Sequence, residues 1–355
     1  MSKFLSKRLS GLEAYVPGEQ PQDRRYIKLN TNESPYPPKR EITDEMSCID
    51  IENLRLYSDP DCKALTEKLA EVYGVSEGNI VFGNGSDEIL SFCFTAFCDS
   101  TTPAVFPDIS YGFYKVFAEL CCIDYRQIPL KSDFTINPDD YKNAGGTIFI
   151  ANPNAPTGLA LELSQIEEIL KENRENVVVI DEAYVDFGAQ SAVGLIEKYD
   201  NLIVVQTFSK SRSLAGARLG MAIASEQLIC DLQKIRCSNN PYNINRLTQK
   251  IAYEVLCDED YFKDCCKKIQ KSRMFLTAGL VALGFEVIPS CTNFVFAKHN
   301  RISGMDFYKA LKEKGILVRH FTQERICEYN RITVGTDKDV KALLRAADEI
   351  LGGKL

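Results

Sequence analysis

Short apolar runs that end in polar or glycine-containing turns recur along the first two thirds of the chain, each followed by a helical pattern. These candidate strands lie at residues 80–82, 104–106, 147–151, 177–180 and 202–207. Strands that alternate with helices pair in parallel, because the helix carries the chain back to the starting edge of the sheet. The rhythm therefore predicts an α/β fold with a mostly parallel, doubly wound sheet.

The two ends of the chain differ from this central pattern. The opening segment is rich in turn formers and is expected to be an extended arm. After Asn239-Asn240-Pro241 a long helical stretch at 244–280 precedes three further strand signals, at residues 285–288, 293–297 and 331–334. We expect an arm at residues 1–35, a large domain at 36–241 and a smaller α/β domain at 242–355.

The amino-acid composition indicates which kinds of binding partner and which cellular compartment to expect. The formal net charge of −7, without a basic block, predicts neither nucleic acid nor an anionic membrane surface as a partner. The opening segment lacks the apolar stretch of a signal peptide, and no apolar run reaches membrane-spanning length. The 13 cysteines, an odd number with adjacent pairs, favour reduced thiols in the cytoplasm. The two histidines lie outside any metal-ligand cluster, so we expect no metal.

Polar residues occupy the ends of three candidate strands. Asn154, Asp181 and Lys210 each lie at or just after the carboxyl end of a strand. In an open α/β sheet the ligand crevice lies outside these ends, so the three side chains are expected to converge. Taken singly, Asp181 could cap a helix and Lys210 could be a surface lysine. Their combination at one edge favours a ligand site.

A fourth strand end adds a candidate anion site. Gly83-Asn84-Gly85-Ser86 allows a tight turn whose free backbone N–H groups, at the start of the next helix, attract a phosphate. The third glycine of a dinucleotide fingerprint is missing, because Glu88 occupies its position. Alone this segment indicates a plain turn. With the other strand ends it predicts a phosphate-bearing cofactor.

Four stretches together resemble the fold-type I, class II aminotransferases, which use pyridoxal 5′-phosphate. They are residues 29–35 (LNTNESP), 152–158 (NPNAPTG), 181–184 (DEAY) and 209–220 (SKSRSLAGARLG). More narrowly, three stretches are similar to the histidinol-phosphate aminotransferase branch: residues 15–19 (YVPGE), 56–60 (LYSDP) and 85–88 (GSDE). The resemblance runs from about residue 12 to residue 336. It departs at Ser34 and Ala155, where the family often has asparagine.

The resemblance implies a role for each residue around the cofactor ring. Lys210 would bond covalently to the cofactor's aldehyde and move the proton at the substrate α-carbon. Asp181 would pair with the protonated ring nitrogen. Tyr184 and Asn154 would hydrogen-bond the phenolic oxygen of the ring. Tyr111 matches the aromatic residue that stacks on the ring, with a core tyrosine as the alternative.

The resemblance also implies which residues hold the cofactor phosphate. Gly85 and Ser86 match the helix start and Ser209 lies beside the lysine. Arg218 suits a phosphate because its planar fork donates two parallel hydrogen bonds. Tyr57 matches a residue that reaches the phosphate from the other subunit, so the resemblance implies a homodimer with shared active sites.

Substrate recognition is expected from two arginines and two asparagines. By resemblance, Arg331 would bind the carboxylate of glutamate or the phosphate of histidinol phosphate, and Arg319 would assist. A surface salt bridge is the alternative for Arg319. Asn32 and Asn293 match positions that line the site, although their side chains could equally cap turns.

The activity that the resemblance implies is reversible transfer of the amino group between L-histidinol phosphate and 2-oxoglutarate, a step of histidine biosynthesis. A threonine-phosphate decarboxylase and an aromatic or broad-specificity aminotransferase of the same family are the alternatives. The stretches at 15–19 and 209–220, together with Arg319 and Arg331, favour the aminotransferase over the decarboxylase. A non-catalytic regulator of this fold would carry a DNA-binding segment, for which a match beginning near residue 12 leaves no room.

Overall fold

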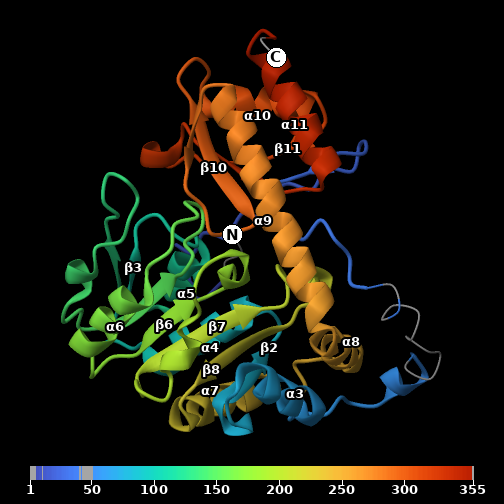
Figure 1. The fold of residues 1–355 in the computed structure, drawn as a ribbon. Helices are drawn as coiled ribbons and strands as arrows, with labels where there is room; N and C mark the ends of the chain where they lie inside the picture. Colours follow the sequence, from blue (N-terminus) through green and yellow to red (C-terminus); the bar gives the residue numbers. More distant parts are fainter. Residues whose placement is uncertain (1–4, 10, 40, 42–50, 354–355) are drawn as a thin grey trace.

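The computed structural model describes residues 5–9, 11–39, 41 and 51–353. Within these residues the chain forms a large sheet of seven strands, a small sheet of four strands, and a pairing of β1 (Ile27–Lys28) with β11 (Ile316–Leu317). Figure 1 shows the large sheet and its helices below and the small sheet and its helices above. The long helix α9 (Glu259–Ala282) runs between them.

The large sheet is mostly parallel, as the strand and helix rhythm predicts. Its order is β2-β8-β7-β6-β5-β3-β4, in which β8 runs antiparallel to both of its neighbours and the other pairs of described strands are parallel. The strands are β2 (Ile80–Gly83), β3 (Ala104–Pro107), β4 (Tyr125–Ile128), β5 (Thr147–Ala151), β6 (Val178–Asp181), β7 (Leu202–Thr207) and β8 (Gly220–Ala224). The sequence pattern does not predict β4 or β8, because β4 is a polar edge strand and β8 directly follows a motif assigned to a loop.

Helices cover both faces of the large sheet. Successive residues of β5 alternate between two apolar clusters: Ile148 and Ile150 belong to one, Phe149 and Ala151 to the other. Because both faces are buried, β5 and β7 are apolar between their ends, and their polar residues Thr147, Gln206 and Thr207 lie at the ends. The covering helices are α4 (Ser86–Phe97), α5 (Phe113–Cys121) and α7 (Glu226–Asn239) on one face and α6 (Leu163–Glu172) on the other.

The small sheet is antiparallel, with the order β12-β13-β10-β9. Its strands are β9 (Phe285–Ile288), β10 (Phe294–His299), β12 (Arg319–His320) and β13 (Asn330–Thr333). Leu276 of α9, Phe307 of α10 (Gly304–Glu313) and Leu343 of α11 (Asp337–Ile350) bury their side chains together with Val295 of β10. The small sheet therefore has a core of its own.

The helical stretch expected at 244–280 is two helices, α8 (Arg246–Cys257) and α9. The break falls at Asp258, whose carboxylate accepts a hydrogen bond from the Tyr261 backbone N–H at 3.1 Å and so caps α9. Helix α8 packs on α3 (Lys63–Tyr73), and its Ala252 and Leu256 join the apolar cluster beside β2 and β8. A domain boundary near residue 241 therefore stays a prediction.

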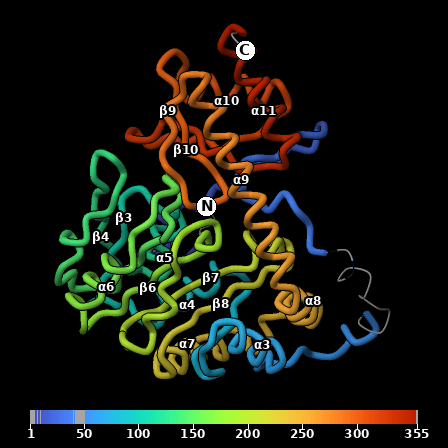
Figure 2. Tube along the Cα trace, viewed as in Figure 1, coloured from blue at the N-terminus to red at the C-terminus, as the bar shows by residue number. Residues whose placement is uncertain are grey.

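The N-terminal segment lies against the C-terminal part of the chain. Figure 2 shows the blue segment beside the red one, where β1 pairs in parallel with β11.

Short 3-10 helices occupy several connections: η1 (Lys7–Leu9), η2 (Asn53–Arg55), η3 (Glu77–Asn79), η4 (Pro138–Tyr141), η5 (Val185–Phe187), η6 (Ala192–Leu195), η7 (Ala215–Ala217) and η8 (Glu324–Ile326).

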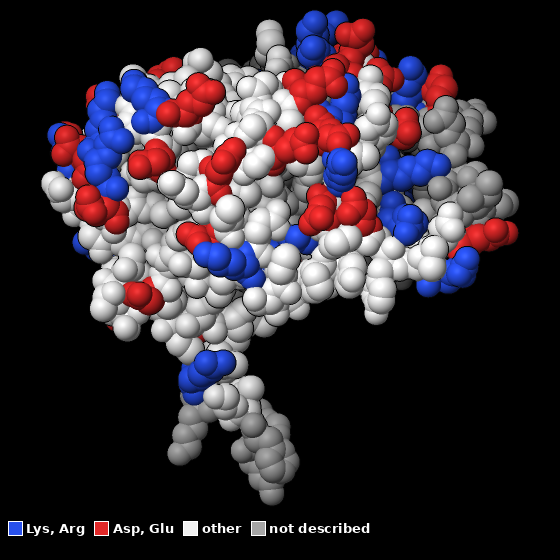
Figure 3. Space-filling view, turned by 90° about the horizontal axis from the view of Figure 1, so that it is seen from below, with Lys and Arg blue, Asp and Glu red and all other residues white. Residues whose placement is uncertain are grey.

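Surface charge is mixed on the face seen in Figure 3, where acidic and basic side chains are interspersed. Interspersed charges give no extended field of one sign on that face. In the part of the chain that the structure describes, no helix is long and apolar enough to cross a membrane.

Two neighbouring positions of α9 test the small-sheet core. Leu276 is 1% exposed, whereas Met274 is 70% exposed on the same helix. Replacement of Leu276 by alanine should lower the free energy of unfolding by about 2–5 kcal/mol, because it removes buried methyl groups and leaves a cavity. Met274→Ala should change it by less than about 0.5 kcal/mol. Urea denaturation measures both, and equal effects would contradict the assignment of the buried face.

Candidate active site

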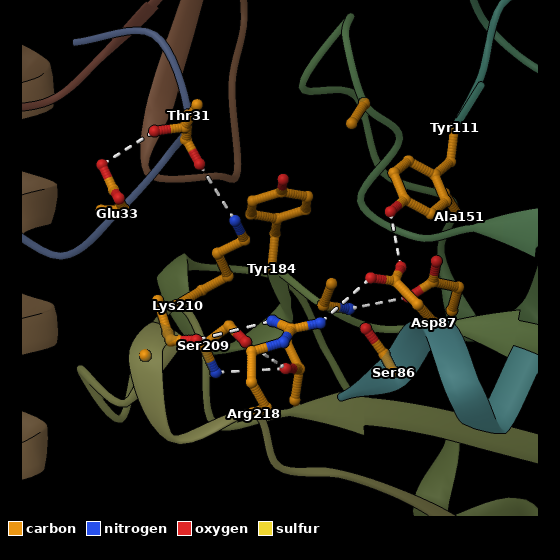
Figure 4. Close-up of a pocket in the computed structure, with 16 residues that line it drawn as sticks. Thr31, Glu33, Ser86, Asp87, Tyr111, Ala151, Tyr184, Ser209, Lys210 and Arg218 are labelled. Atoms are coloured by element: carbon orange, nitrogen blue, oxygen red, sulfur yellow. Dashed lines mark hydrogen bonds and ion pairs between the residues drawn. The ribbon is translucent and has the colours of Figure 1, made fainter. Parts of the chain in front are cut away.

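A cavity of about 330 Å³ opens at the carboxyl ends of β5, β6 and β7 (Figure 4). This edge is where parallel α/β sheets bind ligands. The lining includes a lysine amine, a buried carboxylate, two hydroxyls, a tyrosine and an arginine, from Lys210, Asp181, Ser86, Ser209, Tyr184 and Arg218. Side chains from four strand ends therefore meet at one cavity.

Lys210 follows β7 in a tight loop and points its amine into the cavity (Figure 4). The loop is closed by backbone bonds from Phe208 N–H to the Leu219 carbonyl and from Leu214 N–H to the Phe208 carbonyl. The Lys210 Nζ donates to the Thr31 carbonyl at 3.1 Å and lies 5.8 Å from the centre of the Tyr184 ring. The N-terminal segment thus supplies the acceptor for this amine.

Asp181 is the last residue of β6 and is 5% exposed. Its Oδ1 accepts from the Ala183 N–H at 3.2 Å, and its Oδ2 accepts from the Tyr114 hydroxyl at 3.0 Å. Burial raises the pKa of the Asp181 carboxyl to about 6, against the opposing effect of these two hydrogen bonds. The site therefore contains a carboxylate that can ionise near neutral pH.

Tyr184 and the expected asparagines lie in one neighbourhood but have different partners. The Asn32 amide donates to the Tyr184 hydroxyl at 3.0 Å, and the Asn293 amide donates to the Asn32 carbonyl at 3.0 Å. The Asn154 side chain instead bonds to the segment that follows β3: it donates to the Ile109 carbonyl and accepts from the Ser110 hydroxyl at 2.8 Å. Of these three asparagines, Asn32 contacts a side chain that lines the cavity.

An anion cradle lies at the start of α4. Gly85 has a φ of +86°, and a Cβ there would lie 2.5 Å from Arg218 Nη2, so the close approach of the guanidinium requires glycine. Ser86 begins α4, where free backbone N–H groups favour anions. The Ser209 hydroxyl accepts from the Thr207 hydroxyl at 3.0 Å on the opposite side. These groups together suit a phosphate.

Asp87 links two of the expected cofactor residues. Its Oδ1 accepts from the Tyr111 hydroxyl at 2.6 Å, and its Oδ2 accepts from Arg218 Nη2 at 3.2 Å (Figure 4). Burial, and then the nearby Asp87 charge, raise the pKa of the Tyr111 phenol well above its ordinary value, so the hydroxyl stays a donor. Asp87 therefore holds Tyr111 and Arg218 in place around the cavity.

The two expected substrate arginines lie outside the lining of this cavity, on the small sheet. Arg331 Nη2 donates to the Asn30 carbonyl at 3.2 Å, and its Nε has no partner among the described residues. Arg319 donates to the Val16 and Pro17 carbonyls at 3.1 and 3.2 Å. Arg331 thus keeps open donors, whereas Arg319 is engaged with the N-terminal arm.

Tyr57 lies on the surface of this chain, 78% exposed, with its ring stacked on Tyr242 at 4.4 Å. It does not line the cavity described here. Its expected role, contact with a phosphate in the other subunit, stays a prediction.

Sequence reasoning assigned no role to three residues that lie at or behind the site: Tyr114, Asp87 and Glu182. Tyr114 lies three residues after Tyr111, a spacing that puts both on one side of a helical turn. Asp87 and Glu182 lie within recognised stretches, GSDE and DEAY, but gave no separate signal. Their partners come from residues up to 131 positions away, such as Arg218 for Asp87.

Comparison with known proteins shows the family to which the chain belongs. A family model described as aminotransferase class I and II matches residues 24–346. The chain is 51% identical, over 96% of each chain, to a histidinol-phosphate aminotransferase of Brachyspira hyodysenteriae.

Two solved structures show the fold. The histidinol-phosphate aminotransferase of Sinorhizobium meliloti, in complex with pyridoxal-5′-phosphate, superposes with a TM-score of 0.83 at 23% identity and 92% coverage of each chain. The L-threonine-O-3-phosphate decarboxylase of Porphyromonas gingivalis gives a TM-score of 0.80 at 22% identity, over 92% of this chain and 99% of that chain. The fold alone therefore does not separate the two activities.

The pH dependence of stability tests the buried acid behind the site. Glu182 Oε1 accepts from the Ala192 N–H at 2.6 Å, and Oε2 accepts from the Ser191 hydroxyl and the Gln206 amide. Burial raises the pKa of this carboxyl from 4.5 to about 7, so the folded protein binds its proton more tightly than the unfolded chain. The contribution of Glu182 to the free energy of unfolding is therefore greatest below pH 4.5 and falls as the pH rises to about 7.

Between those limits the wild type should lose about 3 kcal/mol more than Glu182→Gln, at about 1.4 kcal/mol per pKa unit. Denaturant titrations at a series of pH values measure this difference. Glu197→Gln, at an exposed position, is the control and should follow the wild type. Parallel curves for wild type and Glu182→Gln would contradict the raised pKa.

Proposed function

The chain belongs to the class I and II aminotransferases, and from that premise we propose that it transfers the amino group of L-histidinol phosphate to 2-oxoglutarate, with pyridoxal 5′-phosphate as cofactor. The products are L-glutamate and 3-(imidazol-4-yl)-2-oxopropyl phosphate, in a step of histidine biosynthesis. The observation that carries the proposal is a lysine amine and a buried carboxylate at one cavity with an anion cradle. The 51% identical relative supports the choice of substrate.

The residues present fit this cofactor. The anion cradle of Ser86, Ser209 and Arg218 suits its phosphate, and Asp181 suits a protonated ring nitrogen. When bound, the cofactor supplies an electron-withdrawing ring that makes the substrate's α-proton removable. Lys210 would accept that proton at the α-carbon and return it at the cofactor's aldehyde carbon, because its amine points into the cavity.

Arg331 is proposed to bind the substrate anion. Its guanidinium lies 5.3 Å from the centre of the Phe294 ring and 5.8 Å from that of Phe321, and burial lowers its pKa. An anion that reaches these open donors gains charge-assisted hydrogen bonds in a setting with little competing water. Arg319, through the Val16 and Pro17 carbonyls, orders the arm beside it.

We also propose a homodimer in the cytoplasm. An exposed apolar group on this chain supports the dimer, since Ile51, Leu54, Leu56 and Tyr57 are all exposed in one segment. A second copy that covers this segment would bury it and bring Tyr57 to the partner's phosphate. Small-molecule substrates are the partners that the family implies.

The first test is a purified-protein assay of glutamate formation from L-histidinol phosphate and 2-oxoglutarate. Carbon dioxide release from O-phospho-L-threonine is measured in parallel, while the absorbance of the bound cofactor is recorded. We expect turnover of histidinol phosphate well above that of phenylalanine. Carbon dioxide release in its place would move the protein to the decarboxylase branch, and no cofactor absorbance would refute the whole proposal.

In the same assay Lys210→Ala should lower kcat by about 10²–10⁴-fold or more, because Lys210 is the one lysine among the described residues that line the cavity. The phosphate cradle is unchanged in this variant, so it should still bind the cofactor without a covalent bond. Turnover at the wild-type rate would contradict the role of Lys210.

Arg331→Gln tests the anion contact. Loss of charge-assisted hydrogen bonds should lower kcat/KM for both substrates by about 10–100-fold. Arg345→Gln is the matched control, since Arg345 is exposed on α11, and it should leave kcat/KM unchanged. An equal effect of the two replacements would rule out Arg331 as the anion-binding residue.

A further inference from the structure

Tyr114 is fully buried, at 0% exposed, and its hydroxyl is directed at the acid of the site. It lies in the first turn of α5 and donates to Asp181 Oδ2 at 3.0 Å. It does not line the cavity, so it is not placed to touch a ligand there. None of the roles assigned above uses this residue.

The surroundings of Tyr114 leave its ring little freedom. The centres of the Phe106, Phe149 and Tyr111 rings lie 5.8, 5.9 and 5.7 Å from that of Tyr114. Aromatic packing of this kind holds the ring in one orientation. The hydroxyl is therefore presented to Asp181 by a rigid support on a different element of the fold.

Asp181 is also fixed from the other side. Its strand β6 pairs with β5 and β7 through Ala151 and Val205, and its Oδ1 accepts from the Ala183 N–H. Each carboxylate oxygen thus receives one internal hydrogen bond. An ionised carboxylate offers about four acceptor positions, so positions remain for a ligand.

We propose that Tyr114 is a positioning residue that holds Asp181 ionised and oriented toward the ring nitrogen of the cofactor. The proposal rests on the proposed function, because it deepens the role assigned there to Asp181. Tyr114 acts through the carboxylate and exchanges no proton in the reaction.

The charges around Asp181 explain why such a donor matters. Asp87 of α4 is the nearby acid that disfavours a second negative charge, and Lys210 is the cation that favours it. Cys93 of α4 and Tyr111 are the other titratable groups that face it, and burial raises the pKa of each above its ordinary value. The Tyr114 phenol, whose pKa is also raised by burial, stays protonated and keeps donating. Without it, the carboxyl would be harder to ionise.

The fold supplies a matched comparison. Tyr141 is 1% exposed in the apolar cluster on the other face of the large sheet, and its hydroxyl has no partner among the described residues. Tyr114→Phe and Tyr141→Phe therefore remove the same atom from equally buried rings. Only the first loses a hydrogen bond to a charged group.

The test measures cofactor binding before any turnover. Wild type, Tyr114→Phe and Tyr141→Phe are titrated with pyridoxal 5′-phosphate, and the absorbance of the bound cofactor is followed against pH. We expect Tyr114→Phe to raise the Kd about tenfold, the scale of one lost hydrogen bond to a charge, and Tyr141→Phe to leave it unchanged. Equal Kd values for the three proteins would overturn the proposal.

The pH profile separates positioning from general structural damage. In Tyr114→Phe the acid limb of kcat/KM should move up by about one pH unit, the same factor of ten, because Asp181 must lose its proton for activity. An unmoved limb would overturn the proposal. In an Asp181→Asn background, Tyr114→Phe should change the Kd less than about twofold, and an undiminished effect would show that Tyr114 does not act through Asp181.

Two further measurements distinguish the possible causes of a negative result. If wild type shows no cofactor absorbance, the proposed function fails rather than this inference. If Tyr114→Phe does not fold, 3-fluorotyrosine placed at position 114 serves instead, since it is a stronger donor of nearly the same size. It should move the acid limb to lower pH, and an unchanged limb would overturn the proposal.

Discussion

Burial of the large sheet on both faces is the constraint on which the rest of the structure depends. Residues of β5 and β7 are buried at every position, so their side chains must be apolar wherever helices cover them. Polar side chains reach a ligand only where a strand ends and the covering helices stop. Asp181 and Lys210 occupy such ends, and the start of α4 adds the anion cradle at another. The same packing that stabilises the fold therefore selects the place of its chemistry.

Much of this arrangement is predictable from the sequence, because strand ends and turn residues are local features. The strands at 104–106, 147–151, 177–180 and 202–207 appear within one residue of their expected positions. Strand β8 is not predicted because the motif before it indicates a loop and because one of its two partners, β2, lies far away in the sequence. The contact of Tyr114 with Asp181 is not predictable for a related reason. A tyrosine in an apolar helical pattern indicates a core residue, and its hydrogen bond to Asp181 joins positions 67 residues apart. The unequal engagement of Arg319 and Arg331 likewise depends on the N-terminal arm, more than 300 residues away.

The N-terminal segment contacts residues of the site that come from both the large and the small sheet regions. Asn30 lies against Arg331, Thr31 accepts from Lys210, and Asn32 donates to Tyr184. Earlier in the arm, the Glu19 carboxylate bonds to Tyr308 and Lys312 of α10. The arm thus contacts both the group that is to carry the proton and the group that is to bind the substrate anion, so displacement of the arm would loosen both together.

The pairing of this segment with the far end of the chain also sets an order of events during synthesis. The Asn32 N–H donates to the Thr333 hydroxyl across 301 residues, and β1 has its partner in β11. The large sheet, complete by β8, can gather its core while translation continues. The arm has no strand to join until β11 and β13 have left the ribosome. A chain stalled before β11 would therefore have the strands of its large sheet but no partner for β1.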